Sequence, residues 1–161
     1  RLEGGHKDLV FAHYSLESIV KKALKKTGVL FRRTKLALEL SNLQTDVLTD
    51  EKWLVFVLEQ VLTNAVKYTR KGKISIYLDP EKEKTLVVED TGMGIRPEDL
   101  PRIFEWGYTG YNGRIKNRAT GIGLALCRQT MEMLGHRISA KSEPGKGTSV
   151  HMVRRLGNQE G

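Results

Sequence analysis

Cysteine, proline and long apolar runs are scarce in this 161-residue sequence. Cys127 is the single cysteine, so an internal disulfide and a cysteine-based metal cluster are excluded, and a reducing cytosol fits. Because it falls in an apolar helical stretch, we expect a small buried side chain there. No run of about 18 or more apolar residues predicts a membrane span. No signal peptide is visible and the chain starts at Arg1, so we expect a fragment of a longer protein.

The composition is that of an ordinary globular domain with an excess of positive charge. The sequence is 39% hydrophobic and 29% charged, which argues against disorder, and its length suits one domain. The net charge is +8, but the basic residues are scattered and no DNA-reading element is recognisable, so we expect no nucleic-acid partner. An acidic partner protein and anionic lipid both stay open as explanations of the charge.

Hydrophobic periodicity predicts alternating helices and strands, packed as helices on one face of a sheet in an α+β domain. Ser15 caps a predicted helix that runs to about Thr27, and Asp50 caps a long apolar helix over 51–69. A short helix is expected over 97–103 and another over 122–134. The predicted strands are 36–40, 47–49, 74–78, 85–89, 137–142 and 148–153.

The predicted elements set the expected domain boundaries. Residues 15–155 form the domain, and residues 156–161 form a C-terminal tail. Residues 1–14 show no clear period, so we interpret them as a linker or as the tail of an upstream helical domain.

Polar residues share one face of the helix predicted over 51–69. Gln60, Asn64 and Lys67 follow one another at helical spacing, with Tyr68 beside them. In so apolar a helix, an amide and an ammonium need a polar partner or a function. Asn64 would offer an oxygen to Mg²⁺ and Lys67 a charge to phosphate. The alternative is a wet helix face with chance polar residues.

A glycine-punctuated loop follows the strand predicted over 85–89. Asp90, at the strand's end, is held rigidly enough to accept a hydrogen bond from an exocyclic amine. Gly92 and Gly94 would let a flat ring approach the backbone. The alternative is a simple β-turn.

Residues 105–120 lack aliphatic periodicity, which in a compact domain is typical of a functional lid. Arg114, Lys116 and Arg118 lie in this segment, directly before the glycines of Thr120–Leu124. Backbone N–H groups and the helix dipole at such a helix start favour phosphate. A solvated basic loop is the alternative. In the turn after residue 144, the Thr148 hydroxyl is a further candidate, although a plain hairpin would also explain that turn.

These motifs, in this order, resemble the ATP-binding catalytic domain of sensor histidine kinases, in the gyrase, Hsp90, histidine kinase and MutL superfamily. Residues 59–69 resemble its N box and residues 102–108 its F box. Residues 90–94, 120–124 and 145–148 resemble its three glycine boxes. Residues 104–114 further resemble the small Gram-positive kinases paired with peptide-antibiotic transporters.

The resemblance implies a two-layer α/β sandwich of the Bergerat type, with a mixed sheet, helices and an ATP lid. It implies Mg²⁺ on Asn64 and Gln60, although Gln60 stands where the family usually has a second Asn. Asn64 and Lys67 take the catalytic roles, and Asp90 binds the adenine amino group. The implied ATP-binding residues are Gln60, Asn64, Lys67, Tyr68, Asp90, Gly92, Gly94, Ile95, Phe104, Arg118, Thr120, Gly121, Gly123, Leu124 and Thr148.

The family's phosphoacceptor motif is a His followed by an acidic residue and then Pro. His6, His13, His136 and His151 do not match it. The resemblance therefore implies a cytoplasmic, monomeric fragment of a bacterial membrane protein that binds ATP without phosphorylating itself. Its partners would be a separate dimerisation and phosphoacceptor domain and a response regulator. A serine-directed kinase or anti-sigma factor of the same superfamily, and a degenerate domain that binds no ATP, are the competing interpretations.

Overall fold

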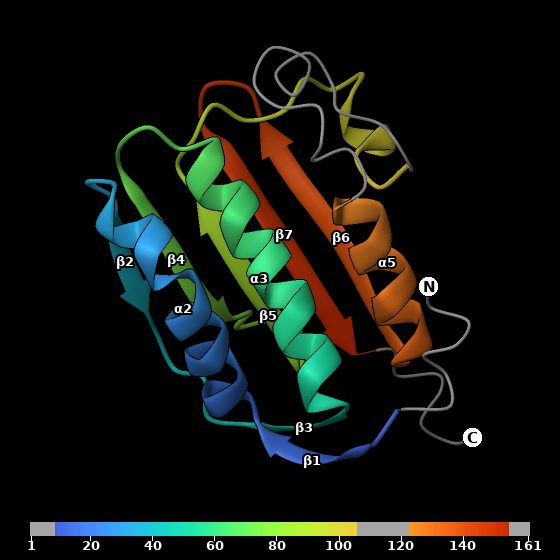
Figure 1. Cartoon of the computed structure of the whole chain (residues 1–161). Coiled ribbons are helices and arrows are strands. Elements are labelled where there is room, and N and C mark those ends of the chain that lie inside the picture. The colour runs from blue at the N-terminus through green and yellow to red at the C-terminus, as the bar shows by residue number, and fades with distance from the viewer. Residues whose placement is uncertain (1–8, 106–122, 155–161) are drawn as a thin grey trace.

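The computed structural model describes residues 9–105 and 123–154. Its main feature is a five-stranded mixed sheet in the order β2-β4-β5-β7-β6 (Figure 1). Strand β2 is parallel to β4, and the other neighbours are antiparallel. The strands are β2 Ala37–Leu40, β4 Lys73–Leu78, β5 Thr85–Asp90, β6 His136–Glu143 and β7 Gly147–Arg154.

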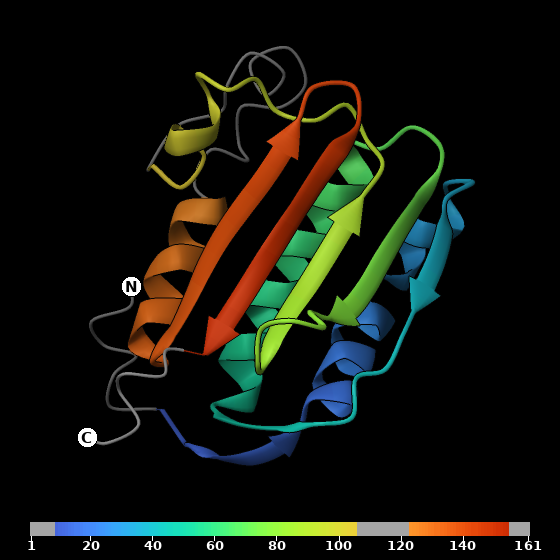
Figure 2. The ribbon, with the colours of Figure 1, turned by 180° about the vertical axis from the view of Figure 1, so that it is seen from behind.

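Helices cover one face of this sheet. They are α2 Leu16–Arg32, α3 Glu51–Lys67 and α5 Gly123–Met133. From behind, Figure 2 shows no described helix on the opposite face. The two layers and the mixed sheet confirm the predicted α+β sandwich. No described helix is long and apolar enough to span a bilayer.

The core lies between the sheet and the helices. Leu58 and Leu62 of α3 are fully buried, as are Ile74 and Ile76 of β4. Ser75, between Ile74 and Ile76, points to the opposite face of the sheet, because side chains alternate along a strand. Burying each such large aliphatic side chain contributes about 1.5–3 kcal/mol before the entropy of ordering is subtracted.

Both predicted helix starts are confirmed by their caps. The Ser15 hydroxyl accepts a hydrogen bond from the Ser18 N–H at 3.2 Å, and Asp50 Oδ1 accepts one from the Trp53 N–H at 3.0 Å. The predicted end of the first helix was wrong, because α2 continues to Arg32 rather than ending near Thr27. Gly28 is tolerated in the helix interior while the apolar face continues beyond it.

Two other elements differ from the prediction. Strand β1 (Ala12–Ser15) pairs with β3 (Asp46–Thr49), so the ordered fold begins before residue 15, where we placed the domain boundary. Instead of a helix over 97–103, the structure has only the 3₁₀ turn η2, Leu100–Arg102. Pro101 removes one backbone donor from that segment, which limits helical bonding.

Strands β5 and β7 bring distant motifs together. Asp90, at the end of β5, pairs with Thr148, near the start of β7. The C-terminal end of α3 lies at the same end of the molecule (Figure 1). The sheet therefore gathers the predicted N box and the first and third glycine boxes at one end.

Candidate functional site

The site is centred on Asp90. Its Oδ1 atom accepts hydrogen bonds from the Gly92 N–H at 2.9 Å and the Thr148 N–H at 3.2 Å. Within the described part of the chain, Oδ2 accepts no hydrogen bond. One carboxylate oxygen is therefore fixed by the fold, and the other is available to a donor from a ligand.

Burial raises the pKa of Asp90, and the negative charge of Glu89 adds to this effect. The hydrogen bonds from Gly92 and Thr148, together with the Thr69 side chain, act in the opposite direction without reversing it. A carboxylate that has lost part of its hydration gains more from a ligand N–H than one in water.

Gly92 packs closely beside this carboxylate. A Cβ added at Gly92 would lie 2.7 Å from Thr69 Oγ1 and 3.0 Å from Asp90 Oδ1, and it would collide with the Tyr68 carbonyl. The position therefore requires glycine because it packs closely against the protein itself, whereas the sequence analysis proposed it as a place where a flat ring approaches the backbone.

Gly94 has a different environment. Its φ is +77°, and an added Cβ would collide with the backbone of Glu143 and Pro144. The Gly145 N–H also donates to the Met93 carbonyl at 2.8 Å. Gly94 thus allows the loop after β5 to lie directly against the β6–β7 turn.

Thr69 also belongs to the site, although it was not among the predicted site residues. This residue is buried, and its hydroxyl has no hydrogen-bond partner of good geometry among the described residues, although the side chain is near enough to Asp90 to lower the pKa of that carboxyl. A buried hydroxyl without a partner is uncommon and points to a ligand or water. The only signal in the sequence is its position directly after the polar Lys67-Tyr68 pair.

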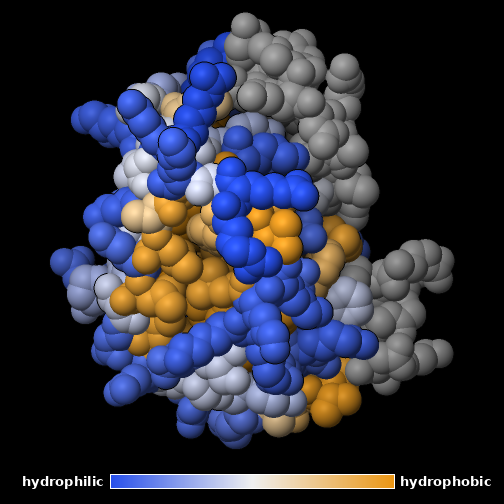
Figure 3. Space-filling model, turned by 60° about the vertical axis from the view of Figure 1, so that its left-hand side comes forward, coloured by the Kyte–Doolittle hydropathy of each residue, from blue (hydrophilic) through white to orange (hydrophobic). Residues whose placement is uncertain are grey.

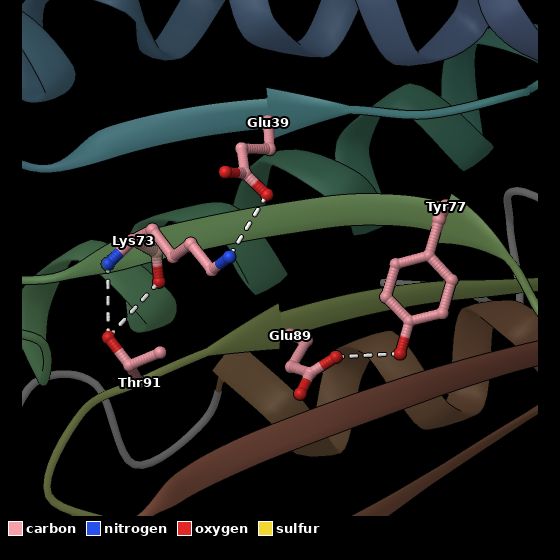
Figure 4. A network of polar contacts seen from close by, with 5 residues as sticks. All are labelled: Glu39, Lys73, Tyr77, Glu89 and Thr91. Carbon is pink, nitrogen blue, oxygen red and sulfur yellow. Dashed lines mark hydrogen bonds and ion pairs between the residues drawn. The ribbon is translucent and has the colours of Figure 1, made fainter.

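Thr91 fixes the loop that carries Asp90. Its hydroxyl accepts a hydrogen bond from the Lys73 N–H at 3.0 Å and approaches the Lys73 carbonyl at 3.4 Å (Figure 4). On the same open face of the sheet, Tyr77 donates to Glu89 at 2.6 Å and Lys73 pairs with Glu39 at 3.1 Å. These contacts tie β2, β4 and β5 together beneath the site.

Ser142 connects three parts of the site and was also not predicted. Its hydroxyl accepts from the Ile95 N–H at 2.8 Å, donates to the Gly147 carbonyl at 2.9 Å, and lies 2.8 Å from Thr148 Oγ1. The predicted residues Ile95 and Thr148 are therefore joined through it.

Helix α3 supplies the polar face predicted from its spacing. Gln60, Asn64, Lys67 and Tyr68 are all half-buried, and burial lowers the pKa of Lys67. Among the described residues, the side-chain amides of Gln60 and Asn64 form no hydrogen bond. Gln60 Oε1 would lie 3.3 Å from a Cβ added at Gly123, so α5 begins directly beside this face.

The remaining predicted residues divide into two groups. Phe104 and Leu124 are half-buried. Arg114, Lys116, Arg118, Thr120 and Gly121, with most of the expected lid, lie outside the described residues.

Residues 49–157 match the family described as histidine kinase-, DNA gyrase B-, and HSP90-like ATPases, and the chain belongs to this family. It is 41% identical over 147 residues to the sensor protein BceS of Halalkalibacterium halodurans, covering 91% of this chain and 44% of the relative. It is 32% identical over 161 residues to the sensor protein kinase GraS of Staphylococcus aureus, covering 99% of this chain and 46% of the relative. The chain thus spans less than half the length of these relatives.

Solved structures agree on the fold. The mycobacterial sensor histidine kinase MprB matches with a TM-score of 0.74 and 24% identity, over 90% of this chain and 97% of that one. The catalytic domain of histidine kinase ThkA matches with a TM-score of 0.73 and 20% identity, over 91% of this chain and 97% of that one. At these identities the likeness shows the shared sandwich fold.

Proposed function

We propose that this domain binds ATP at the end of the sheet around Asp90 and supplies its γ-phosphoryl group to a histidine of a separate domain. The observation that supports this most directly is the half-satisfied Asp90 carboxylate beside the buried Thr69 hydroxyl. An acceptor and a hydroxyl held side by side suit the exocyclic amine and ring nitrogen of adenine, while guanine presents an acceptor where adenine has its amine.

Gly92 joins the end of α3 to the loop after β5. Tyr68, Thr69 and Asp90 leave no room for a side chain at this position, so the two segments pack directly together. The proposed adenine contacts, the Asp90 carboxylate and the Thr69 hydroxyl, lie at this junction. The base would therefore lie toward β5 and β7.

The phosphates would then extend along α3. Lys67, with its pKa lowered by burial, gains from an anionic neighbour, because phosphate offsets the lost hydration of its ammonium group. Tyr68 and the start of α5 at Gly123 lie at the same end of the molecule. Arg118, Thr120 and Gly121 are proposed phosphate ligands from sequence alone, with Phe104, Ile95 and Leu124 beside the pocket.

Asn64 and Gln60 fit a bound Mg²⁺. Their amide oxygens have no other partner among the described residues, and hard cations prefer oxygen ligands. When bound, the metal would neutralise charge on the phosphates. The contribution of the chain itself is to hold Asn64 and Lys67 at a fixed place on one rigid helix, so that the phosphates are oriented before transfer.

The full-length protein would be a two-component sensor histidine kinase, as the names of the relatives indicate for those proteins. Its further partners would be the dimerisation and phosphoacceptor domain and a response regulator. We propose that this piece is a monomeric, cytoplasmic part of a bacterial membrane protein of the antibiotic-sensing type.

Calorimetric titration of the chain with ATP and GTP, with and without Mg²⁺, tests the proposal. We expect binding of ATP that depends on Mg²⁺ and little binding of GTP. Binding of neither nucleotide would favour a degenerate domain that acts through partner proteins. Equal binding of both would remove Asp90 as the residue that selects the base.

A further inference from the structure

The outer edge of β2 has unpaired backbone groups. Among the described strands, only β4 pairs with β2. The Ala37 N–H donates to Gly72 and the Ser41 N–H to Ile76, each at 3.0 Å, so alternate residues of this segment face β4. Leu38 and Leu40, which lie between them, therefore direct their N–H and C=O groups to the free edge.

The same two residues expose apolar side chains. Leu38 is 39% exposed and Leu40 is 42% exposed. They align with the buried Ile74 and Ile76 of β4, so they lie on the helix-covered face at its outer margin. Figure 3 shows an apolar surface on this side of the molecule, surrounded by hydrophilic residues. An exposed apolar strand edge is prone to association unless a partner covers it.

Basic residues lie at the N-terminal end of this edge. Arg32, Arg33 and Lys35 lie just before β2, and Lys71 precedes Gly72, whose carbonyl accepts the hydrogen bond from the Ala37 N–H. All four side chains are exposed, and none forms an ion pair with a carboxylate of the described residues. The acidic residue of β2, Glu39, is already paired with Lys73 at 3.1 Å. The edge therefore has uncompensated positive charge.

We propose that the β2 edge docks an acidic, extended segment of a partner protein, which adds to the sheet as a further strand. The backbone of that segment would pair with Leu38 and Leu40, and alternate apolar side chains would cover theirs. Its carboxylates would meet Arg33 and Lys35, which adds specificity and speeds association. A second copy of this chain is a poorer occupant, because it would bring two domains of net charge +8 together.

NMR titration of the ¹⁵N-labelled chain with synthetic peptides tests this proposal. One peptide alternates leucine and glutamate over about eight residues, a typical strand length, and a matched peptide alternates leucine and lysine. The titrations are made with ATP present, so that peptide binding is measured apart from nucleotide binding. We expect the acidic peptide to shift the amide signals of Leu38 and Leu40, and the basic peptide to leave them unchanged.

Two variants sharpen the test. Leu40→Pro removes an N–H that β4 does not use, so the sheet should persist while strand addition is blocked. The double variant Arg33→Glu with Lys35→Glu should weaken the affinity for the acidic peptide by about tenfold or more. Its control, Lys25→Glu with Lys82→Glu, makes the same change in net charge elsewhere and should have little effect.

Four results would overturn the proposal. The acidic and basic peptides could bind equally, neither could bind, or the shifted amides could lie away from β2. Concentration-dependent dimerisation that Leu40→Pro abolishes would assign the edge to a second copy instead. Folding of each variant is checked by its amide spectrum before titration.

Discussion

Asp90 and Thr148 lie 58 positions apart in the sequence, yet the Thr148 N–H donates a hydrogen bond of 3.2 Å to Asp90 Oδ1. The bond links the end of β5 to the start of β7, where the two residues are paired in register. It uses the carboxylate oxygen that also accepts from Gly92. The fold thus orients the carboxylate and leaves its second oxygen for a ligand.

Replacing Asp90 by Asn should weaken the binding of ATP far more than replacing Lys146 by Ala does. The amide oxygen of the Asn side chain can still accept hydrogen bonds from the backbone. The atom that replaces Asp90 Oδ2, however, is uncharged and can be the amide nitrogen, which donates instead of accepting. Loss of a hydrogen bond to a charged group costs about 1.5–3 kcal/mol, so we expect roughly tenfold to hundredfold weaker binding in calorimetry. Lys146 is an exposed control on the nearby β6–β7 turn. Equal affinities of the two variants would contradict the adenine role.

The same substitution has a predicted effect on stability. Because the pKa of Asp90 is raised in the folded protein, the folded state favours the protonated carboxyl, and its contribution to stability is present at low pH and lost as pH rises through the folded pKa. The melting temperature of Asp90→Asn relative to the parent should therefore rise as pH increases from about 4 to about 7. Asp46→Asn, at the exposed first position of β3, is the control. A constant difference over this range would contradict the prediction.

Asn64→Ala and Asn64→Asp should largely abolish the Mg²⁺ dependence of nucleotide binding. Removing the amide oxygen removes a proposed ligand, and a carboxylate changes the charge at the site. Thr63→Ala is the matched control, because its hydroxyl donates to the Glu59 carbonyl of the same helix at 2.7 Å. The measurement is a titration with and without Mg²⁺. An unchanged metal dependence in both Asn64 variants would remove this residue from the metal site.

Thr69→Val should weaken the binding of ATP while leaving the stability of the fold nearly unchanged. Its buried hydroxyl has no hydrogen-bond partner among the described residues, and it lowers the pKa of Asp90 less than the Gly92 and Thr148 N–H groups do, so replacing it with a methyl group should cost the fold little. Thr130→Val is the control, since its hydroxyl is also buried and has no hydrogen-bond partner among the described residues but lies on α5. Both variants should melt near the parent temperature, and only Thr69→Val should bind ATP more weakly. Identical ATP affinities would exclude a role for Thr69.

Gly147→Ala should destabilise the protein more than Gly145→Ala. Both glycines have positive φ, which costs another residue about 1–2 kcal/mol. A Cβ at Gly147 would also collide with the Asp90 backbone, whereas nothing lies within 4 Å of one at Gly145. Chemical denaturation should show a further loss of about 1–3 kcal/mol at Gly147. Equal losses would mean that the β5–β7 contact yields easily.

The local elements were predictable because their signals are local. Ser15 and Asp50 indicate helix starts because their side chains accept hydrogen bonds from the first turn. The helical spacing of Gln60, Asn64 and Lys67 predicts a shared face on one helix. The end of α2 was not predictable in this way, since packing of its apolar face carries the helix past Gly28. The short strand β1 depends on pairing with β3, more than thirty residues away.

The sequence by itself determined the family, the mixed helix and strand pattern and most candidate ligands, because motif order and periodicity are properties of neighbouring residues. Only the tertiary structure decided which atoms remain available to a ligand. The second oxygen of Asp90, the buried hydroxyl of Thr69 and the linking role of Ser142 follow from contacts between distant segments. Such contacts are fixed when the strands pair and the core packs, so no local pattern records them.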